Sequence, residues 1–429
     1  MKNFSVNFVF WGSSALLRRR LAGIGLCVIS SLAWAQTDHD GLALALFGAT
    51  HVNPLAKSRI EYVESLGHRV DEARTAQLPA LTLIGQSNVA NYNHGLFRFQ
   101  QPLWAFGRID GAIDLAKKQV ISGKAALLLT RRQLMEDTAA TYVSLFGGRQ
   151  RLAIATQNVT EHQRLLSMIS RRMTGGVASE ADVLLARSRL AQAKAVQEQI
   201  AGQVAKAKND LDALTRSDIA GLQPIAPELS RLTPGADFQA LVRSNEAGVL
   251  QKMADLAVIE GNAQQRRMEL MPTIAFRHER DITPSLPLGS TLSTVRSGIY
   301  MESSLEGIGL TGVARLRGEE AKIRSAQEDL EAAKNDASRK VTGHLVNLDN
   351  LRSVKTSQQE TILIAESTLA SFLRQYDAGR KNWIDVLNTQ KELIDNCLAL
   401  EQTRISELEL TLRLAALLGA LDEVAQIQP

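Results

Sequence analysis

The sequence has very little cysteine. Among 429 residues only Cys27 and Cys397 carry a thiol, and Cys27 lies in an apolar run near the N-terminus. So few thiols cannot form the disulfide framework on which small exported domains depend. The chain must therefore gain its stability from buried apolar surface or from assembly with other chains.

Proline is absent from two long spans. Residues 103–223 and 288–428 contain none of the ten prolines and are rich in Ala, Leu, Gln, Arg, Lys and Glu, which favour helices. The second span carries a 3,4 repeat, which predicts long helices packed as coiled coils rather than short globular helices. The repeat runs through Ile384, Leu387, Lys391, Ile394, Leu398, Glu401, Ile405, Leu408, Leu412 and Ala415.

Long hydrophobic runs are missing beyond residue 35. No later window offers 18 uncharged apolar residues, so the sequence predicts no transmembrane helix there. Before that point, Arg18 to Arg20 precede the apolar run 21–32, and Ala33-Trp34-Ala35 supplies the small residues that a signal peptidase reads. We predict a signal peptide at residues 1–35, cleaved after Ala35, with an uncleaved anchor as the alternative.

The sequence also lacks a large net charge of either sign. Lys and Arg number 49 against 45 Asp and Glu, a formal charge of +4. Four of the basic residues lie in the signal, which has no acid, so 45 basic and 45 acidic residues remain after cleavage. The apparent basicity belongs to the signal, and we expect no nucleic acid among the partners.

Aromatic residues are only 5% of the chain, but they are concentrated. Seven of the fifteen beyond residue 35 lie in or beside residues 80–104 and 273–305: Tyr92, Phe97, Phe99, Trp104, Phe106, Phe276 and Tyr300. Both segments alternate in polarity around turn residues, which predicts two β-hairpins. The aromatics suit the interfacial girdles of a membrane barrel; a soluble sheet packed on helices is the alternative.

The chain after the signal repeats one pattern. Leu78-Pro79 recurs as Met271-Pro272, and Gly176-x5-Asp182-Val183-Leu184 recurs as Gly379-x5-Asp385-Val386-Leu387, in the same order. We predict a first repeat at 36–225, with a hairpin near 80–104 and a helix turn near 174–178. A second repeat is predicted at 226–429, with a hairpin near 273–305 and a turn near 377–382.

Segment lengths constrain how each repeat is built. Residues 108–173 suffice for one helix of roughly 99 Å at 1.5 Å per residue, and residues 54–78 and 179–215 placed end to end nearly match it. Each repeat is then a long helix beside two short ones, with two strands at one end. Four strands per chain cannot close a membrane barrel, so assembly is implied: two chains would supply eight strands and three would supply twelve.

With this organisation the sequence resembles the TolC-like outer-membrane efflux and secretion channel family (outer membrane efflux protein). The resemblance spans nearly the whole chain after the signal. It rests on the order and duplication of several short motifs: Leu42 to Ala45, Asn53-Pro54-Leu55, Ala76 to Pro79, Gln101 to Arg108, the two glycine-turn segments, Tyr376 and Leu417-Leu418-Gly419.

The resemblance implies a mainly α protein with a membrane β-barrel, in which two tandem repeats of coiled-coil helices plus a β-hairpin assemble as a trimeric α/β-barrel of 12 strands and 12 tunnel helices. The homotrimer would lie in the outer membrane of a Gram-negative bacterium, in contact with its lipid, with the tunnel in the periplasm. An equatorial belt would draw on residues near 36–50, 217–240 and 420–429. The expected partners are a periplasmic adaptor (membrane fusion protein) and an inner-membrane transporter.

The resemblance also implies a gate at the periplasmic tip. By position, Asp182 and Tyr376 match members of its polar links, and Lys381 stands in place of an arginine, which loses the bidentate fork and is expected to weaken the lock. Asp385 matches one acid of a constriction and Asn388 replaces the second, so the resemblance implies a reduced preference for cations. The alternative role of Asp182 and Asp385 is helix N-capping.

No chemistry-bearing motif competes with this interpretation. We expect no enzyme activity, no cofactor and no metal site, because no two histidines have ligand spacing and Gly307 to Gly312 precedes only helix pattern. The rival function is a periplasmic adaptor-type coiled-coil binding protein without a pore. Within the channel interpretation, residues 379–387 slightly favour type I secretion of a large protein such as an adhesin over drug efflux.

Overall fold

The structure is a computed structural model that describes residues 40–87, 93–217, 219, 238–281, 295–303 and 310–427. The chain divides into Met1–Asp38 and His39–Pro429, and the description below concerns the second unit. The predicted signal peptide and the predicted boundary at residues 225 and 226 lie outside the described residues.

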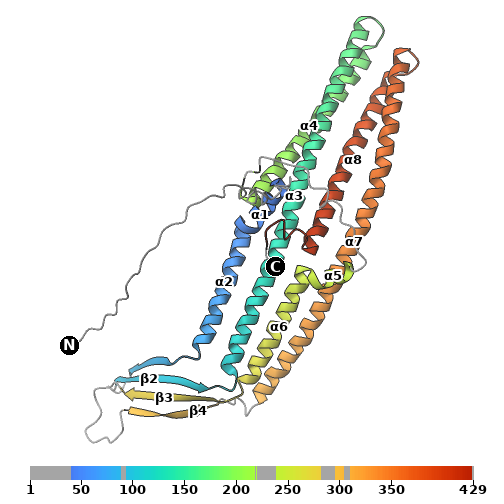
Figure 1. Cartoon of the computed structure of the whole chain (residues 1–429). Helices are drawn as coiled ribbons and strands as arrows, with labels where there is room; N and C mark the ends of the chain where they lie inside the picture. Colours follow the sequence, from blue (N-terminus) through green and yellow to red (C-terminus); the bar gives the residue numbers. More distant parts are fainter. Residues whose placement is uncertain are drawn as a thin grey trace, which may run out of the picture. The chain divides into compact units, whose positions relative to one another are not determined.

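Within the described residues one order of elements occurs twice (Figure 1): a short helix, two strands, a long helix and a second shorter helix. The first set is α2 (Pro54–Thr75), β1 (Ala80–Ser87), β2 (Asn93–Trp104), α3 (Arg108–Thr174) and α4 (Glu180–Thr215). The second is α6 (Ala247–Met268), β3 (Thr273–Asp281), β4 (Val295–Glu302), α7 (Leu310–Asp377) and α8 (Trp383–Leu418). Short elements α1 (Asp40–Phe47), η1 (Gly48–Val52) and α5 (Phe238–Asn245) precede the two sets.

The long helices α3 and α7 run the whole length of the helical layer. Their 67 and 68 residues correspond to about 100 Å each at 1.5 Å per residue. Towards the sheet, neighbouring helices follow the order α2, α3, α6, α7; away from it, the order is α4, α3, α8, α7 (Figure 1). The layer therefore has two lateral margins, α7 on one side and α2 with α4 on the other.

The four strands of the described residues form one antiparallel sheet in the order β1-β2-β3-β4. The two hairpins join through β2 and β3, where Phe99 lies opposite His278 and Gln100 opposite Arg277. The sheet thus repeats the lateral order of the helices, and it leaves β1 and β4 as edges within the described chain.

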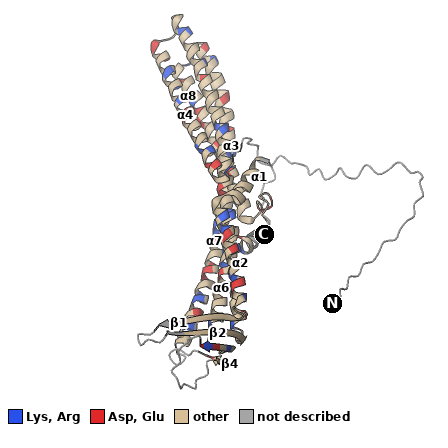
Figure 2. Ribbon diagram, turned by 90° about the vertical axis from the view of Figure 1, so that its left-hand side faces the viewer, with Lys and Arg blue, Asp and Glu red and all other residues tan. Residues whose placement is uncertain are grey.

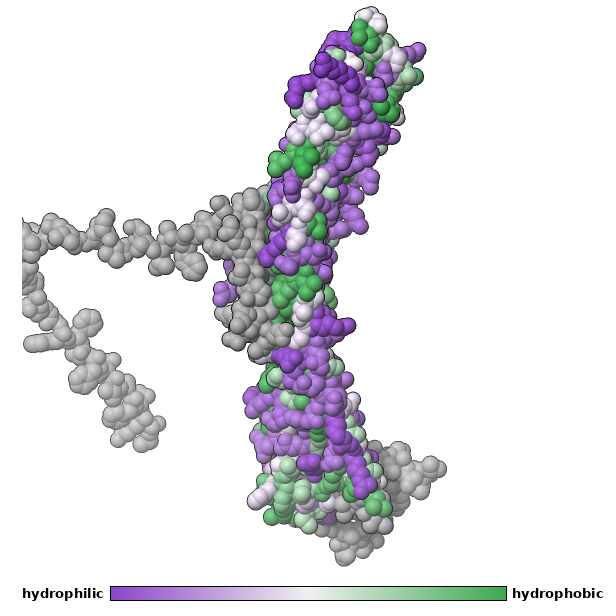
Figure 3. Space-filling view, turned by 90° about the vertical axis from the view of Figure 1, so that its right-hand side faces the viewer, coloured by the Kyte–Doolittle hydropathy of each residue, from purple (hydrophilic) through white to green (hydrophobic). Residues whose placement is uncertain are grey.

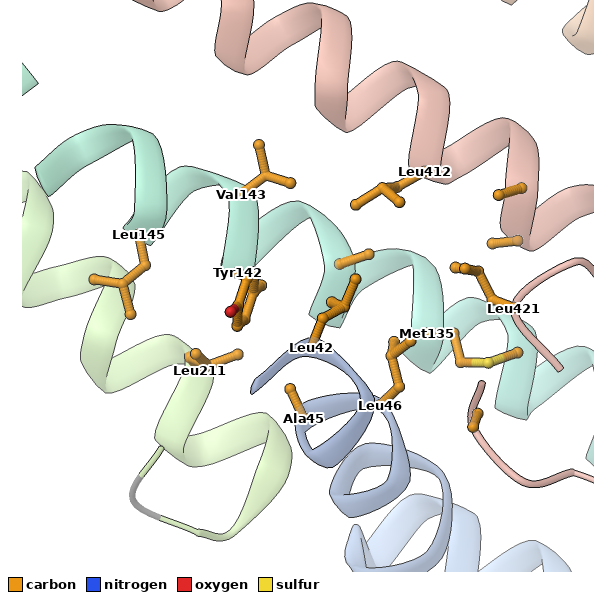
Figure 4. Close-up of a cluster of buried hydrophobic side chains, with 14 of the residues drawn as sticks. Leu42, Ala45, Leu46, Met135, Tyr142, Val143, Leu145, Leu211, Leu412 and Leu421 are labelled. Carbon is orange, nitrogen blue, oxygen red and sulfur yellow. The ribbon is translucent and has the colours of Figure 1, made fainter. Parts of the chain in front are cut away.

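The largest hydrophobic cluster lies midway along the helices (Figure 4). Met135 and Tyr142 of α3 and Leu412 of α8 are fully buried there, and Leu46 of α1 packs onto them. The other labelled residues of the cluster are Leu42, Ala45, Val143, Leu145, Leu211 and Leu421. The N-terminal helix and the C-terminal turns therefore both fold back onto the middle of the layer.

A buried ion pair fastens the C-terminal turns at this level. Arg132 of α3 donates to Asp422 through Nη2 at 2.8 Å and through Nε at 3.2 and 3.3 Å to the two carboxylate oxygens. Its Nη1 donates to the carbonyl of Asn245 at 2.6 Å, and Asn245 donates in turn to the carbonyl of Leu418. One guanidinium thus joins α3, the end of α5 and the chain after α8.

The single 3,4 seam predicted for α8 is incomplete. Leu387 and Leu412 on that seam are fully buried, but Ile384 is 48% exposed, and Trp383 and Val386 beside the seam are buried. The reason is that α8 packs against both α3 and α7, so it buries two stripes rather than one. Within the described residues, no helix combines the length and apolarity needed to cross a membrane.

Candidate functional site

The two helical hairpins end in the same glycine turn. After α3, the Val177 amide donates to the Arg172 carbonyl and Gly176 takes φ +74°; after α7, the Arg380 amide donates to Gln375 and Gly379 takes φ +71°. These are Schellman caps, in which the left-handed position favours glycine. Both turns bring the chain back so that α4 and α8 begin at equivalent positions.

Asp182 occupies the third position of α4 and closes a capping box. Its Oδ2 accepts from the Ser179 hydroxyl at 2.8 Å and from the Ser179 amide at 3.2 Å, while Ser179 Oγ accepts from the Asp182 amide. Such reciprocal bonds satisfy amides that the helix itself leaves free. The alternative role of Asp182, helix capping, is thus present in the structure.

Asp385 occupies the same position of α8 but makes different contacts. The N-cap residue Asn382 makes no side-chain capping bond, and the Asp385 carboxylate pairs with Lys381 Nζ at 3.2 Å. Lys381 Nζ also lies 4.3 Å from the centroid of the Phe372 ring. The structure therefore brings together two of the residues predicted for the gate, as a pair of opposite charges.

Tyr376 lies between the two hairpins. Its ring is 5.1 Å from the ring of Trp383, and the Arg172 guanidinium of α3 lies 4.7 Å above it. Arg172 also pairs with Asp377 at 2.8 Å. The end of α3 is therefore held to the end of α7 through one arginine.

Asn388 joins the hairpins a few turns further from the tip. Its Oδ1 accepts from Arg189 Nη2 of α4 at 3.1 Å, and Arg189 also donates to Gln192 on its own helix. Sequence reasoning missed Arg172 and Arg189. Arg172 contacts Tyr376 and Arg189 donates to Asn388, and both contacts join one hairpin to the other. The only signal for Arg172 was a cation in the last turn of a helix, a common and unspecific feature.

A hydrophobic cluster beneath these links packs the hairpins together. Leu165 and Ile169 of α3, Val183 of α4 and Trp383 and Leu387 of α8 are buried in it. The Trp383 Nε1 atom is buried with no hydrogen-bond partner within the described chain. Packing therefore supplies most of the contact, and the polar links lie around it.

His162 of α3 is 4% exposed near this cluster, and its Nδ1 has no partner within the described residues. Burial lowers the pKa of this imidazole, and Arg189 lowers it further while Glu161 opposes the shift. The ring is consequently held neutral in the folded protein near pH 7.

The sheet at the other end has one apolar face. Residues directly opposed in an antiparallel pair point to the same side, so the registers define two faces. One face carries Leu81, Leu83, Phe97, Phe99, Trp104, Ile274, Phe276, Ile299 and Met301, with Gln101, His278, Arg280 and Ser297 as polar exceptions. Leu83, Ile299 and Met301 are 72%, 70% and 72% exposed, so nothing in the described chain covers them. Figure 3 shows hydrophobic residues gathered at the sheet end of the unit, whereas hydrophilic residues dominate the helices above.

The opposite face of the sheet is charged. Glu279 pairs with Arg98 at 2.7 Å and with Arg296 at 3.7 Å, across three strands. Arg277 reaches Glu302 at 3.3 Å and lies 5.0 Å from the centroid of the Tyr300 ring. The sheet is thus mainly apolar on one side and charged on the other. No group of metal-ligating side chains occurs in the part of the chain that the structure describes.

These features define a class of architecture, in which two long helical hairpins are joined at one end to an antiparallel sheet. Residues 54–215 match the profile described as Outer membrane efflux protein. The chain is similar to the outer membrane protein OprJ of Pseudomonas aeruginosa, with 25% identity over 80% of this chain and 73% of that protein. It is also similar to the toluene efflux pump outer membrane protein TtgF of Pseudomonas putida, with 23% identity over 81% of this chain and 73% of TtgF.

The fold is that of solved structures of this class. The crystal structure of CusC superposes with a TM-score of 0.78 at 15% identity, covering 88% of this chain and 92% of CusC. The resemblance to the TolC-like outer-membrane efflux channel family and the fold class predicted from the sequence are both confirmed. This is a family of passive channels and not of enzymes.

Proposed function

We propose that the protein is the outer-membrane exit duct of a tripartite efflux system, a homotrimeric passive channel that docks a periplasmic adaptor and an inner-membrane transporter. The observation that carries the proposal is the sheet with one exposed apolar face and one charged face. A strand pair facing lipid on one side and a water-filled lumen on the other needs this alternation. A pore-free adaptor, the rival function, gives no reason for an uncovered apolar sheet face.

Strand length supports the same placement. β2 has 12 residues and β3 has 9, close to the roughly 9–11 residues of a tilted strand that crosses a bilayer. Open edges are not tolerated in lipid, so β1 of one copy must pair with β4 of another. Three copies close a barrel of twelve strands, as the resemblance implied.

The helical margins fit the same ring. α7 forms one side of the layer and α2 with α4 form the other, so each copy presents two different surfaces to its neighbours. Contacts between unlike surfaces close into a ring when the rotation permits it. We propose that the tips of the two hairpins then surround the periplasmic opening, with Asp182, Tyr376, Lys381, Asp385 and Asn388 forming its gate.

For the cargo we propose small-molecule efflux, because TtgF, which resembles this chain over most of its length, is described as part of a toluene efflux pump. Type I secretion of a large protein such as an adhesin, which residues 379–387 suggested, is the second candidate. The two candidates differ in which substrate is retained by a cell that lacks the channel.

Deletion of the gene tests the function. We expect the deletion strain to become more sensitive to toluene and other apolar toxicants while surface display of adhesins stays normal, and we expect the intact gene to restore resistance. Lost adhesin display with unchanged resistance would favour secretion. Recovery of the protein as a soluble periplasmic monomer without ion conductance would refute the channel.

A further inference from the structure

The tips of the two hairpins carry an excess of positive charge. The tip segments, defined as residues 171–189 and 374–392, contain eight Lys or Arg and five Asp or Glu, a net charge of +3 per chain. The chain after the predicted signal is formally neutral, so the tip differs from the remainder. Figure 2 shows both signs of charge distributed along the helices below.

Three of the five acids are already engaged. Asp377 pairs with Arg172, Asp385 pairs with Lys381, and Asp182 accepts bonds from Ser179. The carboxylate that would line a constriction therefore has an ammonium group 3.2 Å away. A neutralised carboxylate attracts a passing cation far less than a free one does.

Four of the basic residues have no such partner. Arg171, Arg187, Arg374 and Arg380 are exposed, and no ion pair of the described residues involves them. They flank both glycine turns. Their positive charge is not compensated by a neighbouring carboxylate, so it contributes to the electrostatic potential at the tip.

We propose that the periplasmic mouth of the channel prefers anions, and that Lys381 is the residue that sets this preference by neutralising Asp385. The proposal rests on the trimeric channel of the preceding section, in which three tips bring nine net positive charges around one opening. Clustered charge of one sign at a narrow mouth raises the local concentration of counter-ions. The preference fits efflux substrates that carry a carboxylate, sulfonate or phosphate group. It replaces the weak cation preference that Asp385 alone suggested.

The charged face of the sheet is balanced in sign. Arg98, Arg277 and Arg296 share it with three acids among the described residues: Glu279, Asp281 and Glu302. The sheet therefore adds no net charge, and the positive excess on which the proposal rests lies at the tips.

Reversal potentials across planar bilayers under a KCl gradient test the proposal. We expect the wild-type trimer to show a chloride-to-potassium permeability ratio above one, which decreases as ionic strength rises because salt screens exposed charge. Lys381→Gln should shift the ratio towards potassium by about twofold or more, since it leaves Asp385 uncompensated. Lys194→Gln on α4, an exposed lysine away from the tip, is the matched control and should leave the ratio unchanged.

The possible outcomes separate this inference from the channel itself. A conducting wild-type trimer that prefers potassium, or a Lys381→Gln shift no larger than that of Lys194→Gln, would overturn the anion preference and leave the channel intact. A trimer without any conductance would overturn both. Asp385→Asn, which removes the negative member of the pair, should move the ratio towards chloride.

Discussion

At the scale of single residues, the buried guanidinium of Arg132 ties α3 to the chain that follows α8. Its side chain is 7% exposed and its ion-pair partner Asp422 is 11% exposed. Removing one member of such a pair leaves an uncompensated buried charge, whereas exchanging both for apolar residues can be neutral.

We therefore expect Arg132→Met to lower the free energy of unfolding by about 3–5 kcal/mol, measured by thermal melting of the helical circular dichroism signal. The double variant Arg132→Met with Asp422→Leu should recover most of the loss. Lys391→Met, which breaks the exposed pair with Asp395, is the control and should cost less than about 1 kcal/mol. Equal losses for the two single variants would contradict a buried clamp.

His162 is expected to make the stability of the folded protein depend on pH. Burial lowers its pKa in the folded state, so the unfolded chain binds the proton more tightly. This contribution to stability is fully present above the ordinary histidine pKa of about 6.5 and is lost as the pH falls from that value through the lower pKa of the folded state. The melting temperature should decrease between pH 7.5 and pH 5.5, and the decrease should be smaller in His162→Gln. The exposed His68→Gln is the control, and a decrease reduced equally by both substitutions would argue against His162.

At the scale of elements, α3 and α8 approach closely at Gly147. A Cβ atom at this position would overlap Ile405 Cγ1 of α8, so a side chain there must displace either the Ile405 side chain or the helix that carries it. Such overpacking costs about 1–3 kcal/mol.

Gly147→Ala should thus lower the melting temperature, and the additional substitution Ile405→Ala should cost less in that background than it does alone. Gly202→Ala on α4 is a suitable control, because a Cβ there has no neighbour within 4 Å. That exchange in an exposed helix should be stabilising by up to about 1 kcal/mol. Melting temperatures that fall equally for both alanine variants would show that helix propensity rather than close packing governs Gly147.

The polar links between the hairpins are expected to hold the gate closed. Arg172→Gln combined with Arg189→Gln removes the contacts with Asp377, Tyr376 and Asn388 while the hydrophobic cluster remains. We expect single-channel recordings to show a larger conductance or a greater open fraction. Arg164→Gln, which affects only a pair with Glu161 on the same helix, should resemble wild type. Unchanged recordings for the double variant would exclude these links as a lock.

Local patterns predicted the elements well, and long-range contacts much less so. The proline-free spans and the glycine turns indicated α3, α4, α7 and α8, because helix propensity and Schellman glycines act within a few residues. The contact of Arg172 with Tyr376 joins residues about 200 positions apart, and it depends on how two hairpins lie side by side. No local pattern encodes that arrangement. For the same reason the 3,4 repeat predicts one buried seam on α8, whereas the structure buries two stripes, one against α3 and one against α7.

At the scale of the whole molecule, the described unit is incomplete by itself. Its sheet has unpaired edges at β1 and β4, and its apolar sheet face is exposed. An exposed edge beside an apolar face is an aggregation hazard unless another strand pairs with it. Closure by further copies of the same chain removes both edges at once.

The most direct test of this account is disulfide crosslinking between β1 and β4 in the native outer membrane. In a background with Cys397→Ser, cysteines are placed in pairs at Leu81 or Leu83 of β1 and at Ile299 or Met301 of β4, and each single cysteine is the control. The account predicts that at least one pair gives a covalent ladder that ends at three copies on a denaturing gel, while the single variants give no ladder. A ladder that ends at two copies or continues beyond three, or no crosslink for any pair, would contradict it.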